Sequence, residues 1–155
     1  MSLLIRSFIL SLCFFFVNNA FALELTKSSV ESFMTKIDKA LHARDIDTLA
    51  DSMSDTIQIF ITVDIQGQKQ TVQLSKDQYI DSIKQTLAIA SDYSYDLTVT
   101  NIEIKGDKSF VKATSKEKTT VQGQTISGTT TSEGVIEIID GKFQMTNLTG
   151  QTTIQ

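Results

Sequence analysis

The stretch from Val30 to Ile65, VESFMTKIDKALHARDIDTLADSMSDTIQIFITVDI, decides the fold of this chain. Apolar residues recur in its first part at the spacing of one helix face: Val30, Phe33, Met34, Ile37, Ala40 and Leu41. Ser28, followed by Glu31 three residues later, has the pattern of a capping box, in which two side chains bond the free backbone N–H groups of a helix start. The stretch therefore predicts a long amphipathic helix that begins near Ser28.

A second, shorter helix and a strand are expected next. Asp45 or Asp47 can cap that helix, because a carboxylate oxygen accepts hydrogen bonds from the N–H groups of the first turn. After Asp55 the apolar residues alternate with polar ones, which is the period of a strand with one buried face. The alternating residues are Ile57, Ile59, Ile61, Val63 and Ile65. Phe60 is then the one large apolar residue on the opposite face.

The rest of the chain predicts a hairpin turn at Gln66-Gly67-Gln68 and a short strand near Gln70 to Leu74. A third helix that begins at Ser75 and then four strands are expected to follow. Within the first of these strands the alternation changes phase at Asn101, which indicates a β-bulge, a feature that bends a sheet. These elements predict an α+β fold. Its N-terminal helices would pack on a strongly curved mixed or antiparallel sheet, forming a cone-like α+β barrel.

The segments A-L-H-A-R-D-I-D-T-L-A and S-D-T-I-Q-I-F, between Ala40 and Phe60, together with the order of the elements, resemble the nuclear transport factor 2-like superfamily. That superfamily includes ketosteroid isomerases and SnoaL-like cyclases. The resemblance implies one domain of this fold from about Ser28 to Ile154. Its members differ widely in function, so the fold alone does not assign an activity.

Residues 1–22 have the pattern of a secretory signal peptide. Arg6 supplies a basic start, Phe8 to Val17 form a short apolar run, and Ala20-Phe21-Ala22 matches a cleavage site. The run is too short to span a bilayer. We therefore expect an exported domain of residues 23–155, periplasmic or secreted, that has no membrane attachment after cleavage.

Composition excludes several classes of partner. The chain has 18 acidic and 14 basic residues and a formal net charge of −4. Nucleic-acid-binding domains have a basic excess, so no nucleic-acid partner is expected. The single histidine, His42, has no neighbour at metal-ligand spacing, so neither a metal site nor a cofactor is predicted.

The resemblance also bears on catalysis. Steroid isomerases of the superfamily use a tyrosine on the first helix and an aspartate base on the first strand. Comparison anchored on Asp45 puts these positions at Ile37 and Ile61, neither of which can move a proton. We therefore expect a non-catalytic domain that binds a small apolar ligand or a protein partner. The predicted ligand-binding residues, between the first helix and the sheet, are Phe33, Ile37, Ile61, Tyr79 and Tyr95.

Two alternatives remain open. One is a SnoaL-like acid–base enzyme of isomerase, cyclase or hydrolase type that uses His42 as its base, although that position also suits a cation at a helix C-terminus. The other is a domain that acts through its polar sheet face, as a homodimer or with another protein. That face would carry Lys112, Thr114, Lys116 and Lys118 on one strand, opposite Thr129, Thr131, Glu133 and Glu137 on its neighbour. Superfamily members often dimerise through this sheet, so the resemblance implies a homodimer with a polar, salt-sensitive interface.

Overall fold

Three helices and six strands make up most of residues 23–154, the part of the chain that the computed structural model describes. In chain order they are α2 (Lys27–Ala43), α3 (Ile46–Asp51), β1 (Met53–Ile65), β2 (Gln68–Leu74), α4 (Lys76–Ile89), β3 (Asp92–Lys105), β4 (Lys108–Val121), β5 (Gln124–Ile139) and β6 (Lys142–Ile154). The predicted signal peptide, residues 1–22, lies outside the described residues. No helix within residues 23–154 is long and apolar enough to cross a membrane.

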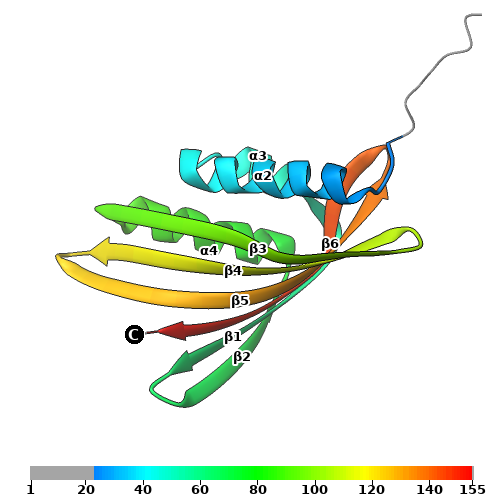
Figure 1. Cartoon of the computed structure of the whole chain (residues 1–155). Helices are drawn as coiled ribbons and strands as arrows, with labels where there is room; N and C mark the ends of the chain where they lie inside the picture. The colour runs from blue at the N-terminus through cyan, green and yellow to red at the C-terminus, as the bar shows by residue number, and fades with distance from the viewer. Residues whose placement is uncertain (1–22, 155) are drawn as a thin grey trace, which may run out of the picture.

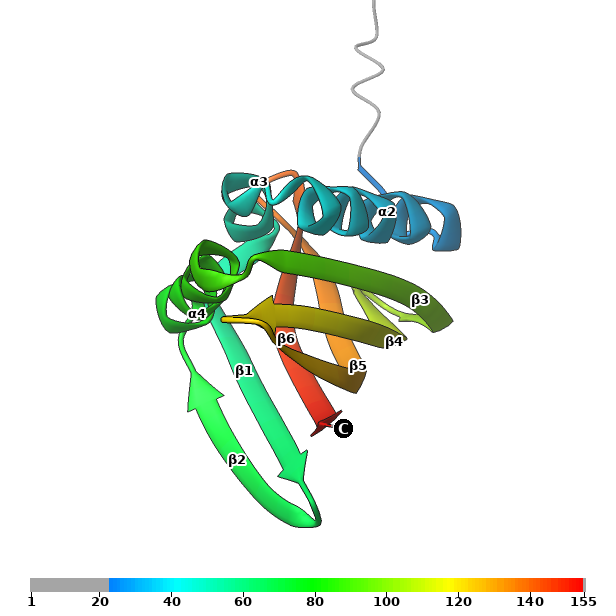
Figure 2. The same cartoon turned by 90° about the vertical axis from the view of Figure 1, so that its left-hand side faces the viewer.

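The six strands form one mixed sheet in the order β2-β1-β6-β5-β4-β3. All neighbouring pairs are antiparallel except β1 and β6, which run parallel. The strands curve strongly, and α2, α3 and α4 lie on the concave side (Figures 1 and 2). The predicted cone-like α+β fold is confirmed, with β2 and β3 as unpaired edges, so the sheet does not close into a barrel.

Helix α2 begins earlier than the sequence pattern predicted. Thr26 is its N-cap: the Thr26 hydroxyl accepts from the Ser29 N–H (3.1 Å), and the Ser29 hydroxyl accepts from the Thr26 N–H (2.9 Å). The predicted capping box of Ser28 and Glu31 is therefore wrong. A serine hydroxyl can take the role usually given to a glutamate at the third helical position, and this moves the start by two residues.

The remaining sequence signals for helix starts and for the bulge are confirmed. Asp45 caps α3, with Oδ1 accepting from the Thr48 N–H at 3.0 Å, and Ser75 caps α4. In β3 the register with β4 shifts between Val99 and Asn101, so one extra residue lies in β3 at the predicted bulge. The bulge lets Val99 and Ile102, on either side of the shift, both pack against the core.

The core consists of two clusters of buried residues under the helices. One contains Ala40, Leu49, Met53, Ile57, Ile59, Ile80 and Met145, and the other contains Val30, Phe33, Met34, Val111 and Ile136. Ile37 on α2 packs against both. Beyond these clusters the concave face becomes partly polar, with Ser115, Glu117 and Thr130 on β4 and β5. The interior is therefore apolar under α2 and partly polar toward α4.

Candidate functional site

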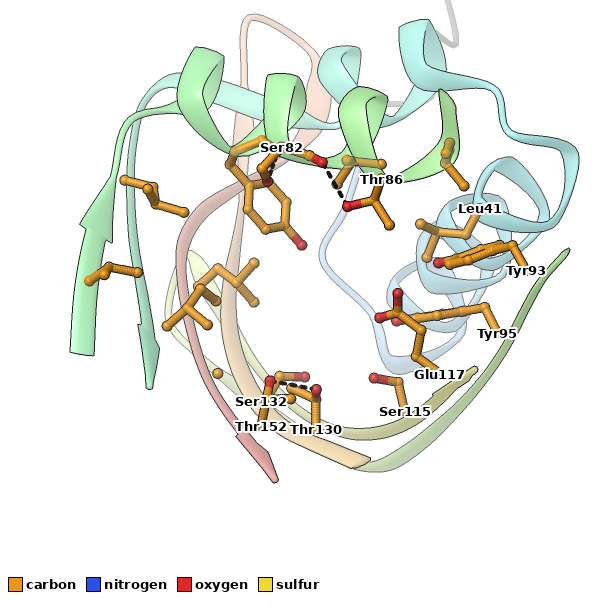
Figure 3. A pocket seen from close by; sticks show the side chains of 18 residues that line it. Leu41, Ser82, Thr86, Tyr93, Tyr95, Ser115, Glu117, Thr130, Ser132 and Thr152 are labelled. Atoms are coloured by element: carbon orange, nitrogen blue, oxygen red, sulfur yellow. Dashed lines mark hydrogen bonds between the residues drawn. The ribbon is translucent and has the colours of Figure 1, made fainter. Parts of the chain in front are cut away.

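A cavity of about 310 Å³ lies between α4, the last turn of α2 and the concave face of the sheet (Figure 3). All six strands contribute to its lining. Leu41 comes from α2; Tyr79, Ser82, Ile83, Thr86 and Leu87 come from α4; Ile61, Val72, Leu74, Tyr93, Tyr95, Ser115, Glu117, Thr130, Ser132, Leu148, Gly150 and Thr152 come from the strands. The site is thus built from parts of the chain that are far apart in sequence.

The two sides of this cavity differ in chemistry. Strands β1 and β2, at one edge of the sheet, contribute the apolar side chains Ile61, Val72 and Leu74. Strands β3 and β4, at the other edge, contribute two tyrosines, a serine and a carboxylate. Figure 3 shows Tyr93, Tyr95 and Glu117 gathered on one side of the cavity. A ligand in this space therefore contacts an apolar wall at one end and an aromatic, acidic wall at the other.

All three tyrosines of the chain line the cavity. Burial is the main cause that raises the pKa of Tyr79, Tyr93 and Tyr95 above the ordinary value of 10.0, and the charge of Glu117 raises each pKa further. A hydrogen bond with Ser115 partly offsets this effect on the pKa of Tyr95. The three phenols therefore stay protonated at neutral pH and can donate hydrogen bonds to a ligand.

Within residues 23–154, Glu117 is the one charged residue in the lining. It lies directly opposite Tyr95 in the β3–β4 ladder, and the Thr119 hydroxyl donates to its Oε1 at 3.2 Å. Glu117 is not among the predicted site residues, although the sequence pattern puts its neighbours Lys116 and Lys118 on the outer face. Since successive side chains of a strand point to opposite faces, that assignment already required Glu117 to point inward.

A smaller apolar chamber of about 80 Å³ lies deeper, under α2. Leu41, Tyr79, Tyr95 and Leu148 line both spaces, so the chamber adjoins the main cavity. Ile37 lines the deep chamber only. The chamber has room for about two water molecules, given a volume of about 30 Å³ per water in the liquid.

The structure places four of the five predicted ligand-binding residues at these spaces. Ile61, Tyr79 and Tyr95 line the main cavity, and Ile37 lines the deep chamber. Phe33 lines neither of them. It is buried in the solid cluster, with its ring centroid 5.9 Å from that of Phe143. Phe33 lies on the same helix stripe as Ile37, but the sheet beneath it carries side chains that fill the space.

His42 is not among the residues that line the cavity. It lies in the last turn of α2, its side chain is 55% exposed, and its Nε2 is 3.5 Å from Asp38 Oδ1. This helix-end position was the alternative interpretation of His42 in the sequence. Within the described part of the chain, no three His, Cys, Asp or Glu side chains gather closely enough to hold a metal ion.

Comparison with known proteins identifies the family of this fold. Residues 30–150 match the SnoaL-like domain family, and no curated protein matches the sequence. A nuclear transport factor 2-like protein from Cytophaga hutchinsonii has 15% identity and a TM-score of 0.63, with 83% of this chain and 98% of that chain covered. A putative scytalone dehydratase from Novosphingobium aromaticivorans has 12% identity and a TM-score of 0.63, with 80% and 81% covered.

A third structure, a hexachlorocyclohexane dehydrochlorinase from Novosphingobium barchaimii, has 15% identity and a TM-score of 0.61, with 81% of this chain and 85% of that chain covered. At such identities the likeness concerns the fold, and the proteins that share it include both enzymes and proteins of unknown function. A domain that binds a ligand or catalyses a reaction is consistent with this fold. The chain belongs to the SnoaL-like domain family, within the nuclear transport factor 2-like superfamily that its sequence resembles.

Proposed function

We propose that this domain binds a small, largely apolar molecule in the cavity between α4 and the sheet and releases it unchanged. The observation that carries the proposal is the cavity itself, about 310 Å³, with the deep chamber of about 80 Å³ adjoining it. Small-molecule sites are typically clefts of roughly 300–1,000 Å³, and this one opens to solvent beside the exposed residues Val72 and Ser82. Its mixture of apolar walls and a few polar groups is typical of small-molecule sites.

The lack of proton-transfer groups at two positions supports binding without catalysis. Ile61 lines the cavity at the position where steroid isomerases of the superfamily have an aspartate. Ile37 lines the deep chamber at the position where they have a tyrosine. His42 is exposed on α2 and does not line either space.

A second candidate function is acid–base catalysis with Glu117 as the base. It is favoured by the position of Glu117, a carboxylate that faces the same space as three tyrosine hydroxyls. The carboxylate can accept a proton from a substrate, and a tyrosine hydroxyl can stabilise the negative charge that develops. The two candidates differ in one result: a binding protein returns its ligand unchanged, whereas an enzyme accumulates product at a rate that Glu117→Gln reduces.

A thermal-shift screen of apolar metabolites against the purified protein tests the binding function. We expect at least one compound to raise the melting temperature. The matched variants are Thr152→Phe, which fills the cavity from β6, and Thr153→Phe, which places the same ring on the opposite face of that strand. The stabilisation should disappear in Thr152→Phe and persist in Thr153→Phe.

Two outcomes would contradict the binding function. The first is that no compound stabilises the protein. The second is that a compound stabilises both variants equally, which would place the ligand outside this cavity. A urea titration of each variant without ligand is the control that checks whether both variants are folded. Mass spectrometry of the recovered compound then separates binding from turnover.

We also propose that the domain acts after export, since residues 1–22 have the pattern of a cleaved signal peptide. Expression of the full chain in a bacterium, followed by N-terminal sequencing, tests this. The protein recovered from the periplasm or medium should begin Leu23-Glu24-Leu25. Uncut chain confined to the cell interior would contradict export.

A further inference from the structure

The charge of the cavity lining is unbalanced. Among the described residues of the lining, Glu117 is the one acidic residue, and there is no lysine, arginine or histidine. Among residues 23–154, no basic side-chain nitrogen lies within 4.0 Å of the Glu117 carboxylate. A partly buried carboxylate costs free energy unless opposite charge or hydrogen bonds compensate it, and Thr119 supplies one such bond to Oε1.

Three aromatic side chains line the cavity together with this carboxylate. Tyr95 lies directly across from Glu117 in the sheet, Tyr93 is two residues before Tyr95 on the same face of β3, and Tyr79 reaches the cavity from α4. Figure 3 shows Tyr93, Tyr95 and Glu117 on the same side of the space. Tyrosine ring faces attract cations, and a nearby carboxylate adds direct charge attraction.

Charges of both signs lie near this wall. Glu117 raises the pKa of all three tyrosines, and Asp38 on α2 adds to the effect at Tyr95. The opposing charges are Arg44, at the C-terminus of α2, and Lys116 and Lys118, on the outer face of β4. Among the described residues, Glu117 is the one charged group that lines the cavity, so it is the charge that a ligand there meets.

The opposite wall has no such polarity. Ile61, Val72 and Leu74 form it, at the other edge of the sheet. On the floor between the two walls, the hydroxyls of Thr130 and Thr152 bond to each other at 2.7 Å, which lessens their need for polar groups from a ligand. The part of a ligand that crosses the floor can therefore be apolar.

We infer that the ligand of this cavity is an amphiphilic cation, with an amine or quaternary ammonium group against Glu117, Tyr93 and Tyr95 and an apolar body along Ile61 and Leu74. This inference rests on the proposed binding function and adds the charge of the ligand to it. An anionic ligand would bring a second negative charge beside Glu117, and none of the described lining residues is a cation that could receive it.

Three probes with the same apolar body test the charge preference: 4-phenylbutylammonium, 4-phenylbutan-1-ol and 4-phenylbutyrate. Their dissociation constants are measured by calorimetry with the purified protein at pH 7.5 and low salt. We expect the ammonium to bind about tenfold or more tightly than the alcohol, the size of effect that one charge-assisted hydrogen bond supplies. The carboxylate should bind more weakly than the alcohol.

Two matched variants test whether Glu117 causes the preference for the ammonium over the alcohol. Glu117→Gln keeps the size of the side chain and removes its charge, so the ammonium and the alcohol should bind it equally well. Glu133→Gln removes a carboxylate from the outer face of β5, where Glu133 pairs with Lys112, and should leave the preference unchanged.

The outcomes separate the two proposals. If the alcohol binds and the ammonium binds no more tightly, or if Glu117→Gln retains the preference, the cation inference is overturned and the binding function stands. If none of the three probes binds at millimolar concentration and no apolar metabolite stabilises the protein, both are overturned. Tighter binding of the carboxylate would also overturn the inference.

Discussion

Ile61 on β1 and Gly150 on β6 lie directly opposite each other in the parallel strand pair, and a methyl group added to Gly150 would lie 3.1 Å from Ile61 Cδ1. Both residues line the cavity, so the Ile61 side chain borders open space. We therefore predict that Gly150→Ala moves Ile61 into the cavity at a cost below about 1 kcal/mol, less than the usual cost of overpacking a filled core. It should also weaken ligand binding, because the cavity becomes narrower.

Urea titration and ligand calorimetry of Gly150→Ala check both parts of this prediction. Gly128→Ala is the control, since its added methyl group would meet its nearest neighbours at an ordinary 3.5 Å. A loss of roughly 3 kcal/mol or more in Gly150→Ala would show that Ile61 cannot move. Unchanged binding would show that the ligand does not occupy the space beside it.

Replacement of Ile37 by aspartate tests the packing of α2. Ile37 contacts both core clusters and lines the deep apolar chamber, where a carboxylate has no cation to pair with. We predict a loss of roughly 3 kcal/mol or more in the free energy of unfolding. The matched control is Lys36→Asp, at the neighbouring exposed position. Near-native stability of Ile37→Asp in a urea titration would mean that this face of α2 is solvated.

The pair of Asp55 and Lys76 predicts a specific dependence of stability on acid. Lys76 Nζ lies 2.7 Å from Asp55 Oδ1 and also donates to the Met53 carbonyl at 3.0 Å, which ties α4 to the start of β1. The hydrogen bond and charge of Lys76 lower the pKa of Asp55 below its ordinary value of 3.8. A lowered folded-state pKa means that this stabilisation is fully present above the unfolded-state value and is lost as the pH falls through the folded-state value.

Chemical-denaturation midpoints measured from pH 6 down to pH 2 check this dependence. Asp55→Asn should flatten the decline between about pH 4 and pH 2 relative to the unmodified protein. Asp96→Asn is the control, because Asp96 is an exposed carboxylate that forms no ion pair within residues 23–154. Identical curves for Asp55→Asn and the unmodified protein would show that the pair does not form in solution.

We also propose that two copies of the chain associate through the outer face of the sheet. Three of the predicted pairs lie opposite each other there: Lys112 with Glu133, Thr114 with Thr131, and Lys116 with Thr129. The other two predicted residues have different partners, since Lys118 lies opposite Ser127 and Glu137 opposite Lys108. Lys112 Nζ is 2.7 Å from Glu133 Oε1, and both side chains are more than half exposed. Cross-strand pairs of this kind contribute about 0.2–1 kcal/mol each and weaken with salt.

Light scattering at micromolar concentration tests the dimer. We expect a dimer mass at low salt that falls toward the monomer mass at high salt. Thr131→Lys, in the middle of this face, should favour the monomer, whereas Asp107→Lys, in the turn between β3 and β4, should not. A monomer mass at both salt concentrations would contradict association through this face.

Local patterns determined most of the secondary structure. The 3.6-residue period located α2, and the change of phase at Asn101 located the bulge in β3, because both depend only on neighbouring residues along the chain. The alternation in β4 and β5 likewise put Lys112 and Glu133 on one face, and a single hairpin then fixed their register. The same alternation, applied to the residue between Lys116 and Lys118, would have found Glu117.

Only the tertiary structure decided where the interior is hollow. Phe33 and Ile37 share one stripe of α2, yet Phe33 meets Phe143 in a filled cluster and Ile37 borders the deep chamber. Periodicity tells which side chains point inward, but the volume left between them depends on the curvature of the sheet and on the parallel pairing of β1 with β6. The curvature and this pairing are set by contacts between residues far apart in sequence, so no single stretch of the chain predicts them.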